Sequence, residues 1–327
     1  MTDRTAGPTP GRGGATSAAP HDGPAATAPS SSAPHDGPAA TAPASGPTSS
    51  APPGGFRPGA DRSRPPAPGD LALPVTGTKL LTGTDGRPLR VVDLPADTDW
   101  VPLGTLDGTP AWATDLSTAD GLPGRARGWA SLAAEVPEPH ATLAGRALAV
   151  LTWRRTHRWC GACRAELTDL PGETARRCPD CDLYVPMQLS AAVLVAITRP
   201  GPVGHADELL LVRHANGPTG LWALVAGFVE AGETLEAAVH REVGEEVRLS
   251  VDDLAYFGSQ PWAISGPGVL LAGFTARAAD PHAEPVVDGE ELTQARWFGL
   301  DALPAELPSA YSISRWLIDA SVTARRR

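Results

Sequence analysis

The segment 221–249 places the strongest restriction on what this chain can fold into. An apolar run at 221–227 ends in a glycine and leads through a short loop into a strongly patterned stretch at 234–247. In that stretch the apolar residues recur every four positions: Leu235, Val239, Val243 and Val247. This spacing predicts an amphipathic helix whose apolar stripe packs against a sheet. A strand, a glycine-containing loop and a helix in this order indicate a mixed α+β fold.

The same expected helix carries a cluster of carboxylates. Glu242 and Glu246 are four residues apart, and Glu245 lies three residues after Glu242, so all three share one side of a helix. A solvated acidic face is the ordinary interpretation of such a cluster. The preceding strand, and the loop that carries Glu233, favour a metal-binding site instead. Hard oxygen ligands on a rigid helix suit Mg2+ or Mn2+, ions that bind phosphates while keeping several waters.

Other elements follow from shorter patterns. Residues 71–123 alternate apolar runs such as Leu89–Leu94 with Gly, Pro and Asp turns, which predicts strands. Apolar spacing predicts helices over 124–136 and 140–156. Towards the C-terminus we expect strands over 191–197, 209–213, 221–227, 269–278 and 295–300, and a last helix near 314–322.

Composition separates the first 69 residues from the rest. They hold 15 of the 35 prolines and 11 of the 35 glycines, which predicts a disordered tail. The net charge of the chain is −10, which argues against general binding to DNA or anionic membranes. No apolar run approaches the roughly 20 residues of a membrane span. The first residues lack an apolar signal segment, so we expect a cytoplasmic, reducing location.

The four cysteines form two pairs. Cys160 and Cys163 make one C-x2-C knuckle, fourteen residues separate it from the second, and Cys178 and Cys181 make that one. Two such knuckles can complete a tetrahedral shell of four thiolates, which predicts a structural zinc ion. Because a closed shell leaves no position for water, this metal is not expected to be catalytic. Redox-active or disulfide-bonded pairs are the alternative.

The loop and acidic helix resemble a known motif. Gly227, five residues, Glu233, seven residues and then Arg241-Glu242-Val243-Gly244-Glu245-Glu246 are similar to the Nudix box of pyrophosphohydrolases. One defining position departs from it, because Arg248 stands where the box has glycine. Near a helix end glycine adopts a left-handed conformation that costs other residues about 1 kcal/mol.

Two further features resemble one family of Nudix hydrolases, the NADH pyrophosphatases. These are the run Ser259-Gln260-Pro261-Trp262 after the box and the four-cysteine module before it. The resemblance implies a Nudix α/β/α sandwich with a mixed sheet, preceded by a zinc ribbon and a smaller N-terminal α+β domain. The expected boundaries are a tail at 1–69, an N-terminal domain at 70–157, a zinc ribbon at 158–187 and a Nudix domain at 188–327.

The resemblance also assigns roles to residues. It implies that Mg2+ or Mn2+ is held by the Ala226 carbonyl, Glu242, Glu245, Glu246 and Glu291. Either Glu245 or Glu246 would act as general base, and Arg241 could orient Glu245 through a salt bridge. The substrate contacts that it implies are Ser259, Gln260, Pro261, Trp262, Glu173, Tyr184 and Ser314. A core tryptophan at a strand edge is the alternative interpretation of Trp262.

The activity implied is hydrolysis of the NAD(H) pyrophosphate to nicotinamide mononucleotide and AMP by a homodimer, with NAD-capped RNA as a further substrate. Two departures, Ala263-Ile264-Ser265 after the tryptophan and Val185-Pro186-Met187 after Tyr184, leave the substrate preference open. Alternatives are a hydrolase of ADP-ribose or another nucleoside diphosphate derivative, and a nucleotide sensor without activity. A nucleic-acid-binding ribbon is the last alternative, suggested by its arginines: Arg154, Arg155, Arg158, Arg164, Arg176 and Arg177.

Overall fold

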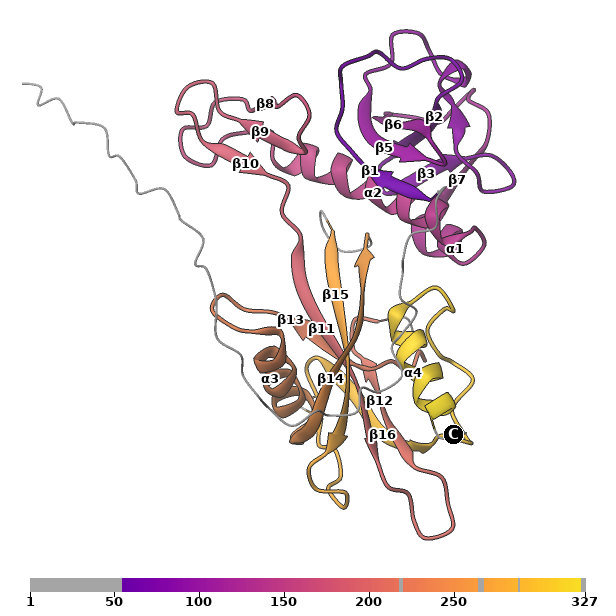
Figure 1. Ribbon diagram of the computed structural model, residues 1–327, viewed down its shortest axis with the longest axis vertical. Coiled ribbons are helices and arrows are strands. Elements are labelled where there is room, and N and C mark those ends of the chain that lie inside the picture. The colour runs from indigo at the N-terminus through magenta and orange to yellow at the C-terminus, as the bar shows by residue number, and fades with distance from the viewer. Residues whose placement is uncertain (1–54, 218–219, 264–267, 288, 325–327) are drawn as a thin grey trace, which may run out of the picture. The chain divides into compact units, whose positions relative to one another are not determined.

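The computed structural model describes residues 55–217, 220–263, 268–287 and 289–324 (Figure 1). Most of the expected disordered tail, together with Ile264 and Ser265, lies outside these residues. Within the described chain, no helix is long and apolar enough to cross a membrane.

An N-terminal sheet of seven strands comes first, and α2 covers it. Its strands pair antiparallel except β2 and β6, which are parallel. Leu143, Ala147 and Leu151 are buried on α2 towards this sheet, and α2 confirms the helix expected over 140–156. The elements are β1 (Phe56–Pro58), β2 (Leu71–Thr76), β3 (Lys79–Thr82), β4 (Leu89–Arg90), a 3-10 turn (Val91–Asp93), β5 (Val101–Leu106), β6 (Thr109–Asp115), β7 (Arg125–Gly128), α1 (Trp129–Ala133) and α2 (Glu138–Thr156).

Three expectations for this region are wrong in detail. The tail does not extend to residue 69, because β1 pairs with β5. The run Leu89–Leu94 is a strand only at its start, since Asp93 accepts a hydrogen bond from the Arg90 N–H and closes a 3-10 turn. The helix expected over 124–136 is confirmed only as α1. Gly124 has a φ of +106°, and β7 pairs with β3 instead of continuing a helix.

A small three-stranded sheet follows α2 and carries the cysteines. Its strands are β8 (Thr168–Asp169), β9 (Ala175–Arg177) and β10 (Tyr184–Pro186), in the order β10-β9-β8. Its core is only Cys160, Leu167 and Cys178, with two partly buried neighbours. So small a core cannot stabilise a fold alone, and a metal is the usual supplement.

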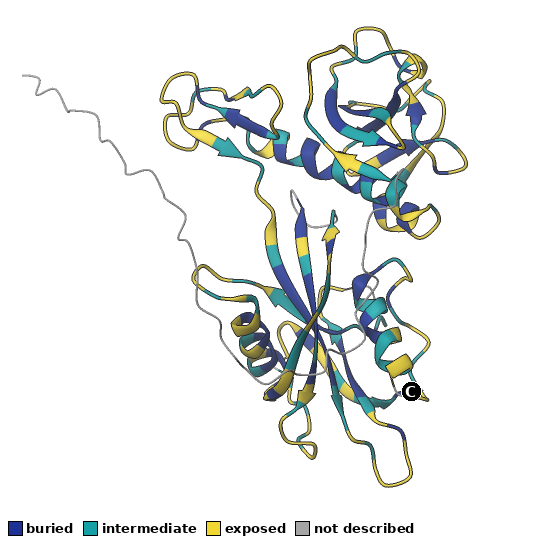
Figure 2. Cartoon of the chain, in the orientation of Figure 1, coloured by how far each residue is buried: buried dark blue, intermediate teal, exposed yellow. Residues whose placement is uncertain are grey.

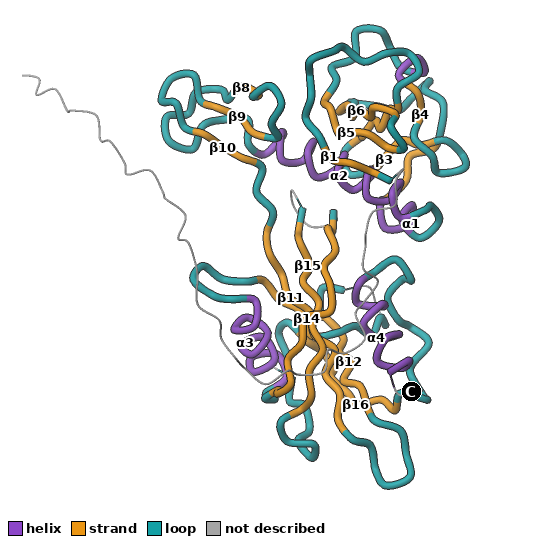
Figure 3. The backbone as a smooth tube through the Cα atoms, in the orientation of Figure 1, coloured by secondary structure: helices purple, strands orange, loops and turns teal. Residues whose placement is uncertain are grey.

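The C-terminal sheet lies between two helices, as expected for an α/β/α sandwich (Figures 1 and 3). Its strand order is β14-β15-β11-β12-β16, and β13 pairs with the first half of β11. Strands β11 and β15 are parallel, so the sheet is mixed. The elements are β11 (Ser190–Arg199), β12 (Glu208–His214), β13 (Val225–Phe228), α3 (Leu235–Val247), β14 (Val251–Trp262), β15 (Val269–Ala278), β16 (Leu292–Gly299) and α4 (Ile313–Ala324).

Alternation along the strands divides the residues between the two helices. Val193 and Val195 of β11 pack with α3, whereas Leu194 and Ala196 pack with α4. Both sets are buried, because each face of the sheet is covered (Figure 2). The predicted strands of this region are confirmed, with shifted ends. The run 221–227 forms a strand only from Val225. Strand β14 was not predicted.

Candidate active site and zinc centre

The four cysteines converge at one point of the ribbon. The Cys160 and Cys181 sulfurs are 3.6 Å apart, those of Cys163 and Cys178 are 3.3 Å apart, and all four lie within 4.8 Å of one another. Tetrahedral zinc at about 2.3 Å from each sulfur separates the sulfurs by about 3.8 Å, so the donor set fits this ion. Backbone N–H groups of Cys163 and Ala162 lower the pKa of Cys160, whereas hydrogen bonds among the thiols raise the pKa values of Cys163 and Cys181. Thiolates are the form that binds zinc. The centre is a structural zinc site.

Asp169 joins the ribbon to the end of α2. Its carboxylate accepts hydrogen bonds from Arg154 and from Arg176, the latter at 2.8 Å, and Arg62 adds a third at 2.9 Å. Burial raises the pKa of Asp169, but the hydrogen bonds from Arg154 and Arg176 outweigh it, so the pKa lies below its ordinary value.

We expect Asp169→Asn to lower the free energy of unfolding by about 2 kcal/mol at neutral pH, because it leaves partly buried arginines without their charge partner. A depressed carboxyl pKa contributes stability above the unfolded pKa, and this stability is lost as the pH falls through the folded value. Urea unfolding at several pH values should therefore show a difference that shrinks in acid. Asp182→Asn, which changes an exposed ribbon aspartate, is the control. Equal midpoints for Asp169→Asn and the wild type at pH 7 would contradict the prediction.

The ribbon arginines are largely neutralised by neighbouring acids. Arg158 pairs with Glu166 at 2.9 Å, and Arg177 pairs with Asp182 at 2.9 Å. Arg155 contacts Asp115 through one nitrogen at 3.0 Å from each carboxylate oxygen. A cationic track for a nucleic-acid backbone needs arginines that are not already paired. These pairs argue against a general nucleic-acid-binding ribbon.

Local sequence explains where α3 begins and ends. The Thr234 hydroxyl accepts the Ala237 N–H at 3.1 Å and caps the first turn. The stripe of Val239, Val243 and Val247 is fully buried against the sheet. At the other end Arg248 adopts φ 57°, the left-handed conformation that glycine usually supplies. The loop geometry expected of the box is therefore kept, at a conformational cost.

Arg248→Gly should raise the free energy of unfolding by about 1 kcal/mol, because it removes the strain of a side chain in the left-handed region. Arg248→Ala is the matched control, since it removes the guanidinium but keeps a Cβ at the same φ. Chemical unfolding at neutral pH distinguishes the two variants. A gain in the alanine variant as large as that in the glycine variant would show that the side chain, and not the backbone, is responsible.

The carboxylates of α3 differ in exposure. Glu242 and Glu246 are 7% and 3% exposed, whereas the side chain of Glu245 is 61% exposed. The Glu242 carboxylate fills the space beside Gly227 of β13, where any Cβ would overlap it. Burial raises the pKa of Glu242; Arg241 opposes the shift, and the negative charges of Glu245 and Glu291 add to it. Glu291 thus acts electrostatically on the same site, although it precedes β16 and is distant in sequence.

Arg241 links the loop before α3 to the acidic face. It contacts both oxygens of Glu233, at 2.7 and 3.0 Å, and donates to the Phe228 carbonyl at 2.8 Å. One further nitrogen donates to Glu242 at 2.8 Å and to Glu245 at 3.1 Å. The predicted Arg241–Glu245 salt bridge is confirmed. The hydrogen bonds to Glu233 raise the pKa of Arg241 even above the usual arginine value, so the guanidinium keeps its proton.

The expected metal ligands are not gathered as tightly as the cysteines. Among the described residues, the cysteine quartet is the only set of three or more such ligands whose donor atoms all lie within 4.8 Å of one another. The guanidinium of Arg241 lies between Glu242 and Glu245 and holds both. A divalent ion that binds these carboxylates would compete with Arg241 for their oxygens.

Gln260, an expected substrate contact, is a buried residue of β14. It is 3% exposed, its amide nitrogen donates to the Tyr311 carbonyl at 2.7 Å, and its amide oxygen accepts the Ile313 N–H at 2.8 Å. Both polar ends thus hold the start of α4, as a buried amide requires. Trp262 lies two residues further along β14 and therefore on the same face. Ser259 and Pro261 are exposed and alternate to the other face.

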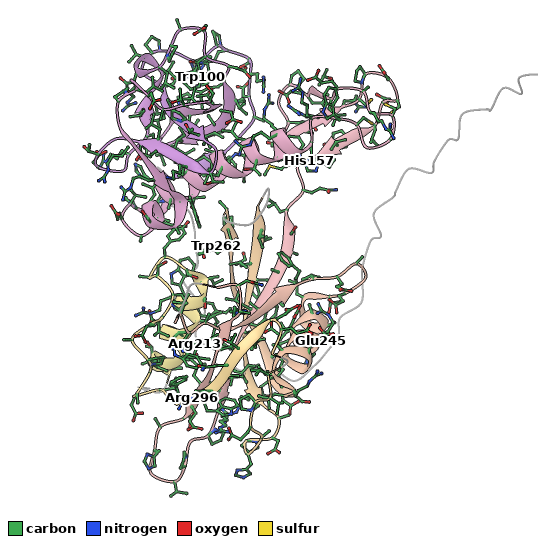
Figure 4. The ribbon with its side chains drawn as sticks, turned by 180° about the vertical axis from the view of Figure 1, so that it is seen from behind. Trp100, His157, Arg213, Glu245, Trp262 and Arg296 are labelled. Atoms are coloured by element: carbon green, nitrogen blue, oxygen red, sulfur yellow. The ribbon has the colours of Figure 1, made fainter. Side chains whose placement is uncertain are left out.

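Phe228, which no sequence pattern singled out, is 55% exposed and lies directly after the glycine that accommodates Glu242. Strand alternation puts Phe228 on the α4 face, where the cross-strand register continues through Ala192 and Leu271 to Gln260. The signal was present: if Gly227 faces the carboxylates, the next side chain must face away. Figure 4 labels Glu245 on α3 and Trp262 at the end of β14.

The other predicted substrate residues lie in the ribbon and on α4. The Tyr184 hydroxyl donates to Glu173 at 2.8 Å. The Arg177 guanidinium lies over the Tyr184 ring, with its Cζ 5.7 Å from the ring centroid. The hydrogen bond to Glu173 raises the pKa of Tyr184. Ser314 lies in the first turn of α4, and its N–H donates to the Ser312 hydroxyl at 3.2 Å. The roles of Glu173, Tyr184 and Ser314 as substrate contacts remain predictions.

The sandwich, the box and the acidic helix define the Nudix class of hydrolases. A NUDIX domain model matches residues 188–317, and a model of the NADH pyrophosphatase zinc ribbon domain matches residues 155–185. A Pseudomonas fluorescens protein named NAD-capped RNA hydrolase NudC is 39% identical over 226 residues, covering 68% of this chain and 77% of that protein. A Deinococcus radiodurans protein of the same name is 35% identical over 266 residues, covering 81% and 92%. The chain belongs to the NADH pyrophosphatase family of Nudix hydrolases, pyrophosphohydrolases that use Mg2+ or Mn2+.

Proposed function

We propose that the enzyme hydrolyses the pyrophosphate of NAD(H) to nicotinamide mononucleotide and AMP, and that it also accepts NAD-capped RNA. The observation that carries this proposal is the arrangement around β13. Gly227 packs on the buried carboxylate of Glu242, and the next residue presents an exposed aromatic ring. A site for pyrophosphate chemistry beside a surface for a flat base suits a dinucleotide. The relatives named NAD-capped RNA hydrolase support the substrate class.

In this proposal the divalent ion is held by the Ala226 carbonyl, Glu242, Glu245, Glu246 and Glu291. When bound, the ion neutralises the pyrophosphate oxygens and lowers the pKa of a water. One of Glu245 and Glu246 takes the proton of the attacking water. Arg241 keeps Glu242 and Glu245 on one side of the helix, and it ties the helix to the Phe228 carbonyl.

Recognition of the bases is assigned to two groups of residues. Phe228 offers an exposed ring at the box, and the Ser259–Trp262 segment offers Ser259, Pro261 and the Trp262 indole. Glu173, Tyr184 and Ser314 are further substrate contacts, expected from the family resemblance. Gln260 fixes this segment to the chain at the start of α4, because both ends of its amide bind backbone there.

The test is a substrate panel with product identification. NADH, NAD, ADP-ribose and NAD-capped RNA are incubated with Mg2+ or Mn2+, and products are identified by mass spectrometry. Cleavage of NADH between the two phosphates, with AMP and the reduced mononucleotide as products, is the expected outcome. Faster turnover of ADP-ribose than of any nicotinamide dinucleotide would overturn the substrate assignment. Tight NADH binding without metal-stimulated turnover would identify a sensor instead.

We also propose that the protein is a homodimer and that it works in the cytoplasm. The exposed apolar side chains of Leu189, directly before β11, and Leu270, on the adjacent strand β15, are consistent with a covered surface in the assembly. The four unpaired cysteines are consistent with a reducing compartment. Analytical ultracentrifugation tests the first proposal, since a single monomeric species at micromolar concentration would contradict it.

A further inference from the structure

The indole of Trp262 packs on the N-terminal domain. Its ring meets the ring of Trp129 edge to face, with centroids 5.0 Å apart and planes at 86°. Trp129 itself is fixed: it is 4% exposed, and its indole N–H donates to the Ala141 carbonyl at 2.9 Å. The end of the Ser259–Trp262 segment therefore has a rigid aromatic neighbour outside its own sheet.

Trp129 is also linked to Gln260 of the segment, through Tyr311. The Trp129 and Tyr311 rings are 5.5 Å apart at 82°, again edge to face. The Tyr311 carbonyl accepts the amide of Gln260 at 2.7 Å. Contacts thus form a closed circuit from Trp129 to Trp262, along β14 to Gln260, and through Tyr311 back to Trp129. One side chain of the N-terminal domain thus contacts Trp262 directly and Gln260 through Tyr311.

Free space next to the Trp262 ring means that its orientation depends on the contact with Trp129. A cavity of about 380 Å3 opens beside Trp262, with Gly145 and Arg146 of α2 among its lining residues. A Cβ at Gly145 would lie 3.0 Å from the Trp129 indole nitrogen and 3.4 Å from the Ala263 Cβ, so α2 holds Trp129 closely. The cavity leaves space beside the Trp262 ring, which is only partly buried. Without Trp129, the ring could turn into that space.

We propose that Trp129 is a positioning residue, which holds Trp262 and the Ser259–Trp262 segment in the orientation that meets the substrate base. This inference rests on the proposed function. It gives the N-terminal domain a part in substrate recognition although it contributes no residue to the acidic site.

The test compares KM and kcat for NADH in the presence of Mg2+. Trp129→Leu keeps apolar volume but removes the aromatic edge, and it should raise KM about five- to tenfold with kcat changed less than about threefold. Trp129→Phe keeps a ring and should stay near the wild type. In Trp262→Ala, adding Trp129→Leu should cause no further rise, because the two residues act through one contact. Trp112→Leu is the matched control, since it changes another buried tryptophan of the same domain that bonds Asp70.

The proposal is overturned if KM is unchanged in Trp129→Leu, or if Trp112→Leu raises KM by the same factor. It is also overturned if the KM rises of Trp129→Leu and Trp262→Ala multiply in the double variant. If Trp129→Leu does not fold, Gly145→Ala decides, because its methyl displaces Trp129 without removing it; an unchanged KM there contradicts the role. If the wild type does not cleave NADH, the proposed function fails. The positioning role is then decided by calorimetric NADH affinity, which should fall in Trp129→Leu and stay unchanged if the proposal is wrong.

Discussion

Replacing Glu246 by Gln is expected to lower kcat for NADH hydrolysis by at least about 100-fold. Glu246 is buried at 3% exposure on α3, one turn beyond Glu242. Glutamine has nearly the same volume, so the packing against the sheet is kept, but the negative charge that attracts a divalent ion is lost. If Glu246 also takes the proton of water, the loss of kcat should persist at saturating Mg2+. If Glu246 only binds the metal, the loss should become smaller as the Mg2+ concentration is raised.

The control for this variant is Glu236→Gln, which changes an exposed carboxylate in the first turn of the same helix. It should retain near-normal kcat and the same Mg2+ dependence. Circular dichroism and unfolding midpoints must match the wild type in both variants. Near-normal turnover in Glu246→Gln would contradict the proposed metal and base assignment, whatever the control does.

Replacing Cys160 and Cys163 together by Ser should abolish zinc binding and unfold the ribbon. Thiolate–zinc bonds contribute on the order of 10 kcal/mol to the folding of small zinc modules, and a hydroxyl does not replace them. Cys160 and Cys178 form most of the ribbon core, so the core is lost together with the metal. We expect one zinc per wild-type chain, none in the variant, and a much lower thermal unfolding midpoint.

Asp180→Asn provides the comparison within the second knuckle, because it changes an exposed side chain between Cys178 and Cys181. That variant should keep its zinc and its midpoint. A double-serine variant that unfolds at the wild-type temperature would remove the structural role of the metal. A chelator should reproduce the loss in the wild type and leave the already metal-free variant unchanged.

Short-range patterns predicted the parts of the molecule that local sequence controls. The four-residue spacing of Val239, Val243 and Val247 identified α3 and its buried stripe, because a helix returns to the same face at that interval. The cysteine spacing identified the ribbon for a similar reason, since each knuckle alone brings two sulfurs together. The salt bridge from Arg241 to Glu245 also lies within one turn.

What could not be predicted depends on contacts between distant segments. Whether Gln260 faces a substrate or the backbone before α4 is decided by residues 51 positions away. The ribbon arginines read as a basic cluster in sequence, and only the fold shows the acids that pair with them. The strand β1 was hidden in a proline- and glycine-rich stretch, because its stability comes from β5.

The alternation along β13 separates the two tasks of the proposed enzyme. Gly227 turns to the carboxylates on one side of the sheet, and Phe228 turns to the other side. A substitution at Phe228 can therefore change which base is accepted without disturbing the hydrolytic centre. At Gly227 the opposite holds, since even a methyl group would displace Glu242. Variants selected for a different RNA cap can therefore carry substitutions at Phe228 but not at Gly227.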